Sequence, residues 1–120
     1  MTPRVLLIDD DPLLCDLTTM FFKAEGFEFE SLSEGKDAVK TVEEWLPEAV
    51  ILDLNLPDMS GLDLLGELQA WSDVIVLSGD RDPATVKTAF EHGAKDYVAK
   101  PFMPAELVWR CQTLLMPKAA

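Results

Sequence analysis

The chain of 120 residues is long enough for one domain that buries about two-thirds of its unfolded surface without disulfides or structural metals. Its net charge of −12 argues against nucleic acid or an anionic membrane as a direct partner, and its 48% hydrophobic content argues against disorder. No apolar run approaches the ~20 residues of a membrane span, and no signal peptide precedes the first predicted strand. Cys15 and Cys111 lack metal-ligand spacing, so we expect a cytoplasmic protein with buried, reduced thiols.

The first half of the chain predicts two strand–helix units. Residues 5–8 form a continuous apolar run, which is typical of a strand buried on both faces of a parallel sheet. Asp11 and Pro12 suit the N-cap and first turn of a helix that ends near Gly26. Residues 27–32 alternate between apolar and polar, as an edge strand does, and residues 33–46 predict a second helix that stops before a proline.

The second half predicts three further strands, each followed by a helix. Residues 50–53 form an apolar strand that ends at Asp53, and the Pro-Asp-Met-Ser-Gly segment after it predicts a loop that leads into a helix. The remaining strands are predicted at residues 74–77 and 96–99, with helices that open at Pro83 and Pro104 and a last helix that Pro117 closes. Five strands alternating with five helices indicate an α/β domain around a parallel sheet, spanning residues 1–120.

Polar side chains stand at the predicted carboxyl ends of four strands. Because parallel strands joined by right-handed crossovers point their carboxyl ends to one rim, we expect these side chains to meet there: Asp9, Asp10, Asp53, Ser78 and Lys100. Three carboxylates and one ammonium leave two negative charges, which one Mg²⁺ would neutralise with the oxygen ligands that it prefers. The arrangement suits phosphoryl transfer to a carboxylate nucleophile. Without the other rim residues, the simpler interpretation of Asp53 would be an aspartate that ends a strand or caps a turn.

Four segments together resemble the receiver domains of bacterial two-component response regulators, and the resemblance covers essentially the whole chain. They are residues 7–11 (LIDDD), 52–61 (LDLNLPDMSG), 77–79 (LSG) and 93–102 (GAKDYVAKPF). The resemblance implies a doubly wound, flavodoxin-like five-stranded sheet with strand order 2-1-3-4-5. One departure is Gly79, where alanine is commoner in the family.

The resemblance also assigns roles at the rim. Asp53 would accept a phosphoryl group from the phosphohistidine of a sensor histidine kinase or phosphotransfer protein. Asp10, Asp53 and the main-chain oxygen of Asn55 would ligate Mg²⁺, and Asp9 would act through a metal-bound water. The protein would then be a signalling switch and not an enzyme with a substrate of its own.

Further roles concern the phosphoryl group and the signal. By resemblance, Ser78 and Lys100 would bind the phosphoryl oxygens, Ser78 and Tyr97 would form the switch, and the bond before Pro101 would be cis. Each of Asn55 and Asp80 lies two residues beyond a rim residue, so we expect them to order an attacking water and shorten the phosphoaspartate lifetime.

The predicted output surface consists of the fourth helix, the fifth strand and the last helix. In regulators with a winged-helix output, a set of charged residues pairs two receivers through this face. Asp96, Glu106 and Arg110 match that set, whereas Val86 and Lys95 do not. We therefore predict a monomer, or a weak dimer on activation, that binds a downstream effector or output domain through this face.

Several alternatives stay open at this point. The chain could be the receiver portion of a longer DNA-binding transcriptional regulator, or a degenerate receiver that serves only for docking. An aspartate-nucleophile phosphatase would carry its nucleophile at the first strand and need a cap. A flavin-binding module would need a Ser/Thr/Gly-rich phosphate loop where this chain has three aspartates. Trp45, Trp71 and Trp109 predict packing or partial exposure, and His92 fits a helix C-terminus.

Overall fold

The computed structural model describes residues 2–116 and forms one parallel sheet of five strands in the order β2-β1-β3-β4-β5. The strands are β1 (Arg4–Ile8), β2 (Glu28–Leu32), β3 (Ala49–Asp53), β4 (Asp73–Ser78) and β5 (Asp96–Ala99). The helices are α1 (Pro12–Ala24), α2 (Ala38–Trp45), α3 (Gly61–Leu68), α4 (Pro83–Glu91) and α5 (Pro104–Leu115). The predicted doubly wound, flavodoxin-like α/β fold with strand order 2-1-3-4-5 is confirmed.

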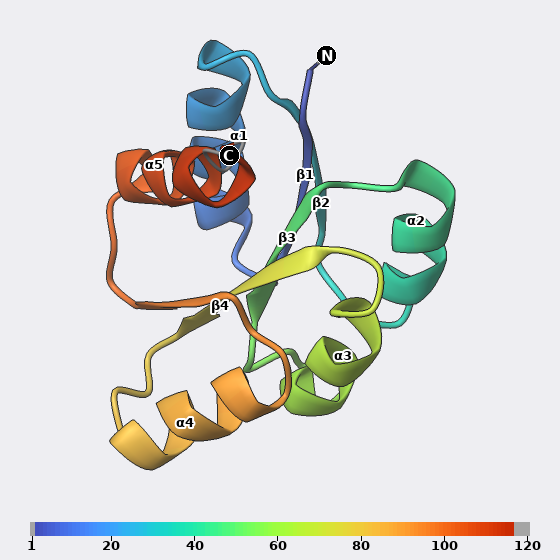
Figure 1. Ribbon diagram of the computed structural model, residues 1–120. Helices are drawn as coiled ribbons and strands as arrows, with labels where there is room; N and C mark the ends of the chain where they lie inside the picture. The colour runs from blue at the N-terminus through green and yellow to red at the C-terminus, as the bar shows by residue number, and fades with distance from the viewer. Residues whose placement is uncertain (1, 117–120) are drawn as a thin grey trace.

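The helices cover both faces of the sheet (Figure 1). Helices α1 and α5 lie on one face, and α2, α3 and α4 lie on the other. Every residue of β3 is buried, and in β1 and β4 all residues but the first are buried. This burial explains why these strands appear in the sequence as continuous apolar runs.

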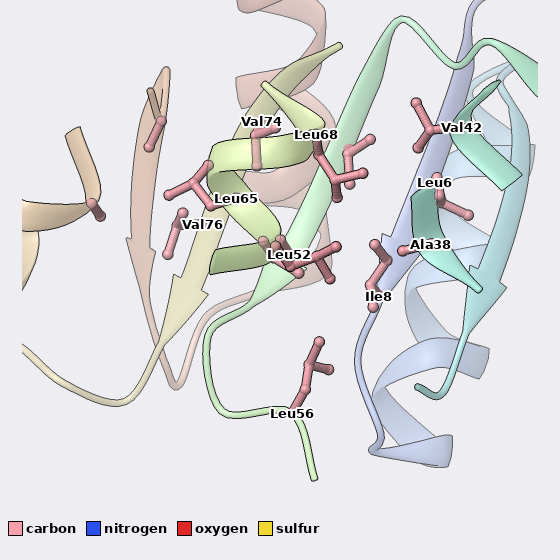
Figure 2. Close-up of a cluster of buried hydrophobic side chains, with 14 residues drawn as sticks. Leu6, Ile8, Ala38, Val42, Leu52, Leu56, Leu65, Leu68, Val74 and Val76 are labelled. Carbon is pink, nitrogen blue, oxygen red and sulfur yellow. The ribbon is translucent and has the colours of Figure 1, made fainter. Parts of the chain in front are cut away.

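Two hydrophobic cores fill the space between the sheet and its helices. One core joins the sheet to α2, α3 and α4 and includes Leu6, Ile8, Leu52, Leu65 and Val76 (Figure 2). The other joins the sheet to α1 and α5, where the Phe22 ring stacks on Phe29 at a centroid distance of 4.7 Å.

The predicted helix boundaries hold where a local signal sets them. The Asp11 side chain accepts hydrogen bonds from the N–H groups of Leu13 and Leu14, and Asp82 caps α4 in the same way through Ala84. After α1, Gly26 takes a φ of +89°, a conformation that glycine adopts at no steric cost. Pro117, predicted to close the last helix, lies outside the described residues.

Two sequence predictions need correction. Helix α2 begins at Ala38 and not at Ser33, because residues 35 and 36 form a turn whose N–H groups bond to another loop. Cys111 is buried as predicted, but Cys15 is only partly buried. Burial raises the pKa of Cys15 to about 11 and that of Cys111 to about 12, so both remain thiols near neutral pH. The partial exposure of Trp71 and Trp109 agrees with the prediction for the tryptophans.

Within the described residues, no helix has both the length and the apolar character that crossing a bilayer requires.

Candidate phosphorylation site

The strand register brings the predicted rim residues together. Ile8 of β1 is level with Leu52 of β3, so the following residues, Asp9 and Asp53, emerge side by side. Asp53 is in turn level with Leu77 of β4, one residue before Ser78. Ser78 is level with Ala99 of β5, the residue before Lys100. The shared edge of the sheet thus collects all four positions.

Three carboxylates form a cluster at this edge. Oxygen atoms of Asp9, Asp10 and Asp53 lie within 4.8 Å of one another. Asp9 is fully buried and Asp53 is 3% exposed, whereas the Asp10 side chain faces solvent. Such an all-oxygen donor set fits a hard cation such as Mg²⁺ better than a softer metal.

Lys100 supplies the positive charge of the site. Its Nζ donates to Oδ2 of Asp9 at 2.9 Å and to Oδ2 of Asp53 at 3.2 Å. Burial by itself would lower the pKa of Lys100, but its hydrogen bond to Asp9 and the charges of both aspartates outweigh burial and raise it. Lys100 is therefore a firmly charged ammonium in contact with Asp53.

Asp9 is held by the protein at both of its carboxylate oxygens. Oδ1 accepts a hydrogen bond from the Asp11 N–H at 2.9 Å, and Oδ2 accepts from Lys100. Burial raises the pKa of Asp9, although both of these hydrogen bonds act in the opposite direction. Within residues 2–116 the Asp10 carboxylate accepts no hydrogen bond, so Asp10 is the more accessible of the two acids.

Asp53 is the last residue of β3, and each of its carboxylate oxygens accepts a hydrogen bond. Oδ1 accepts the Asn55 N–H at 2.9 Å, and Oδ2 contacts Lys100. The backbone of Asn55 is thereby tied to the carboxylate, while the Asn55 side chain is exposed. The Leu54 N–H donates to the carbonyl of Leu77, which fixes the start of the following loop to β4.

Ser78 and Tyr97 are connected through the backbone of Asp80. The Asp80 N–H donates to the buried Ser78 Oγ at 3.0 Å, and the Tyr97 hydroxyl donates to the Asp80 carbonyl at 2.6 Å. The Asp80 carboxylate accepts from the Asp82 N–H and from the Thr85 hydroxyl. The side chain of Asp80 is thus bonded toward α4. Sequence reasoning missed Thr85, since a single threonine within a predicted helix gives no signal of such a contact.

Three further positions singled out in the sequence are Pro101, Gly79 and His92. The Lys100–Pro101 peptide bond is cis, as predicted. A Cβ added to Gly79 would meet no atom within 4 Å, so the departure from alanine at this position has no steric cause. His92 lies at the C-terminal cap of α4, and its Nδ1 is 2.8 Å from the Thr88 carbonyl.

The parallel sheet and the acidic rim define the class of doubly wound α/β domains that place a site at the carboxyl ends of their strands. Within that class, the chain belongs to the response regulator receiver domain family, whose sequence model matches residues 5–112. This assignment establishes a domain of a signalling switch and decides against the phosphatase-like and flavin-binding alternatives.

Named relatives agree with the assignment. The chain is 41% identical over 117 residues to the DNA-binding response regulator MtrA of Mycolicibacterium smegmatis, with 96% of this chain and 51% of that protein covered. The receiver domain protein (CheY-like) of Methanospirillum hungatei superimposes with a TM-score of 0.89 at 25% identity, covering 96% of this chain and 94% of that one. Response regulator DrrB of Thermotoga maritima, an OmpR/PhoB homologue, superimposes with a TM-score of 0.87 at 29% identity. This match covers 96% of this chain and 53% of the DrrB chain. The chain spans about half the length of the curated relatives it matches.

Proposed function

We propose that Asp53 accepts a phosphoryl group from the phosphohistidine of a sensor histidine kinase or phosphotransfer protein. The observation that carries the proposal is the position of Asp53: a nearly buried carboxylate at a strand end, held by Lys100 and flanked by two further acids. A carboxylate oxygen attacks phosphorus, the bond from phosphorus to the histidine nitrogen breaks, and the nitrogen keeps the electron pair. The product is an aspartyl phosphate and a free imidazole.

The acidic cluster would hold Mg²⁺. Asp10, Asp53 and the main-chain oxygen of Asn55 are the proposed ligands, and the exposure of Asp10 supports direct contact. Asp9, which is fully buried and accepts hydrogen bonds at both carboxylate oxygens, would act indirectly, through a metal-bound water. When bound, the ion supplies positive charge against the incoming phosphoryl oxygens.

Lys100 and Ser78 would bind the phosphoryl oxygens. The Lys100 ammonium already contacts the carboxylate that would be modified, and the hydroxyl of Ser78 lies at the end of the adjacent strand. If Ser78 turns toward the new dianion, it must leave the Asp80 N–H, and the Asp80 backbone also bears the Tyr97 hydrogen bond. Ser78 and Tyr97 would act as a coupled switch by this route.

The signal would leave through the face formed by α4, β5 and α5. On this face Arg110 pairs with Asp96 at 2.8 Å and with Glu106 at 3.2 Å inside one chain. Charges already satisfied within the chain contribute little to a dimer. We therefore propose a monomer, or a weak dimer on activation, that binds an effector through this face. Light scattering with and without beryllofluoride measures the mass, and a tight dimer in the unactivated state would contradict this proposal.

A second candidate is that the chain is the receiver portion of a longer DNA-binding regulator. The similarity to MtrA, a DNA-binding response regulator of which this chain covers half, favours it. With a net charge of −12, the receiver portion would not itself bind DNA. The effector of the switch would then be an output domain of the same polypeptide.

The test of the proposed function is phosphorylation by a small donor. The protein is incubated with acetyl phosphate, once with Mg²⁺ and once with EDTA, and its intact mass is measured. We expect a gain of about 80 Da, the mass of one phosphoryl group, with Mg²⁺ only. No gain in either sample would indicate a degenerate receiver used only for docking, and an equal gain in both would contradict the metal site.

A further inference from the structure

Asp58 joins two loops that are distant in the sequence. Its Oδ1 accepts the N–H of Gly35 at 2.9 Å, and its Oδ2 accepts the N–H of Lys36 at 2.9 Å. Gly35 and Lys36 lie between β2 and α2, whereas Asp58 lies between β3 and α3. The Gly35 N–H is the largest cause of the lowered pKa of Asp58, and the Lys36 N–H acts in the same direction. Each carboxylate oxygen thus has its own backbone donor.

The first turn of helix α2 is not capped by the side chain of its own N-cap residue. Asp37 stands at the N-cap, and its side chain makes no capping hydrogen bond. The turn before α2 closes through the Ala38 N–H and the Gly35 carbonyl at 3.0 Å. Asp58 therefore satisfies two donors of this turn from the neighbouring loop.

The β2–α2 loop and the β3–α3 loop are also packed closely against each other. A Cβ added to Gly35 would lie 2.5 Å from Sδ of Met59 and 3.1 Å from a methyl carbon of Leu56. Leu56 is 9% exposed and belongs to the core that contains Ile8, Ala38 and Leu52. Figure 2 shows its side chain pointing from the loop toward the ends of β1 and β3. The glycine at position 35 thus permits close approach of the two loops.

The loop that Asp58 holds is the one that carries Asn55. At its start, the Leu54 N–H is bonded to β4 and the Asn55 N–H is bonded to Asp53. At its end, a Cβ on Gly61 would lie 2.4 Å from the Leu54 carbonyl oxygen, so the two ends of the loop are in direct contact. Asp58 adds a third point of attachment, in the middle of the loop and on the side of α2.

We propose that Asp58 is a positioning residue for the metal site: by fastening the β3–α3 loop to the turn before α2, it holds the main-chain oxygen of Asn55 where a divalent cation needs it. This inference rests on the proposed function, in which that oxygen is a metal ligand. Asp58 is exposed and does not itself belong to the acidic cluster.

A simple turn-capping role makes a different prediction from a positioning role. A cap contributes to the stability of the fold and leaves the affinity for Mg²⁺ unchanged. A positioning residue changes the affinity for Mg²⁺, while the maximal rate of phosphorylation at saturating Mg²⁺ stays near the wild-type value. The two roles are separated by measuring metal affinity, maximal rate and stability on the same variants.

The experiment compares Asp58→Ala, Asp58→Asn and the control Asp63→Ala. Asp63 is an exposed acid in the first turn of α3, so its removal costs the same charge, and within residues 2–116 its side chain makes no hydrogen bond. Calorimetry measures the Kd for Mg²⁺ without any phosphoryl donor. Intact mass against time, at increasing Mg²⁺, gives the half-saturating Mg²⁺ concentration and the maximal rate with acetyl phosphate.

We expect Asp58→Ala to raise the Kd for Mg²⁺ about three- to tenfold, less than the 10–100-fold typical of groups that contact a metal ligand directly. Asp58→Asn keeps one acceptor oxygen, so its Kd for Mg²⁺ should lie between those of the wild type and Asp58→Ala. The Kd of Asp63→Ala should match that of the wild type. An unchanged Kd in a folded Asp58→Ala protein overturns the inference and leaves the proposed function standing. A wild-type protein that binds no Mg²⁺ overturns both. The NMR amide shifts of Gly35 and Lys36 report whether each variant has lost the contact.

Discussion

The most informative perturbation of the site is Lys100→Met, which removes the only lysine in contact with Asp9 and Asp53 among the described residues. At separations of 2.9 and 3.2 Å, with an effective dielectric constant of about 20, each pair has a gross attraction of roughly 5 kcal/mol. The desolvation of three charged groups offsets most of this attraction. The Lys100 side chain is 29% exposed, so we place the net loss of stability at about 2 kcal/mol, below the ~3–5 kcal/mol of fully buried pairs.

The assay is urea unfolding of the metal-free protein, repeated at a saturating concentration of Mg²⁺. Lys95→Met is the matched control, because Lys95 is exposed and the same side chain is introduced. Without Mg²⁺, we expect Lys100→Met to lose about 2 kcal/mol and Lys95→Met to change by less than about 0.5 kcal/mol. At saturating Mg²⁺, the difference in stability between Lys100→Met and Lys95→Met should become smaller. A cluster of three carboxylates that has lost its lysine counter-charge is stabilised more by the bound ion. Equal stability of the two variants without Mg²⁺ would refute this electrostatic description of the site.

Two further predictions follow from the loops around the site. Gly61→Ala should lower the free energy of unfolding by about 1–3 kcal/mol, because its Cβ would meet Leu54 backbone atoms at 2.4–2.7 Å. Gly66→Ala in the same helix places a Cβ that meets nothing within 4 Å, so it should raise the free energy of unfolding by about 0.5–1 kcal/mol. Urea unfolding tests both, and destabilisation of equal size would contradict the contact. Asn55→Met should slow the loss of phosphate more than Asp80→Leu, because the Asp80 carboxylate is already bonded to Asp82 and Thr85. The rate at which the phosphorylated mass disappears measures this, and a larger effect of Asp80→Leu would contradict this order and favour the Asp80 side chain as the group that orders the water.

The parts of the fold that the sequence predicts correctly depend on local signals. Asp-Pro pairs mark the starts of α1 and α4 because the aspartate side chain reaches N–H groups only two or three residues ahead. Continuous apolar runs identify the central strands because both faces of those strands are buried. Once the strands are parallel, the alignment of their carboxyl ends places Asp9, Asp53 and Lys100 together, which the contacts of Lys100 confirm.

What the sequence does not reveal depends on contacts between distant segments. The turn before α2 is bonded to Asp58, more than twenty residues further along the chain, and an exposed acid in a loop gives no hint of such a partner. Arg110 is bonded to Asp96 within one chain, and charge matching alone cannot distinguish this from a contact between two chains. Nor does the sequence show that the Asp80 side chain turns toward Thr85, because the choice between solvent and a hydroxyl depends on the path of the loop.

The measurement that tests the central claim most directly is the intact mass of Asp53→Asn after incubation with acetyl phosphate and Mg²⁺. The wild type and the control Asp63→Asn should each gain about 80 Da, and Asp53→Asn should gain nothing, because an amide oxygen is a poor nucleophile toward phosphorus. A full gain of about 80 Da in Asp53→Asn would show that another residue is the acceptor and would contradict the assignment of Asp53.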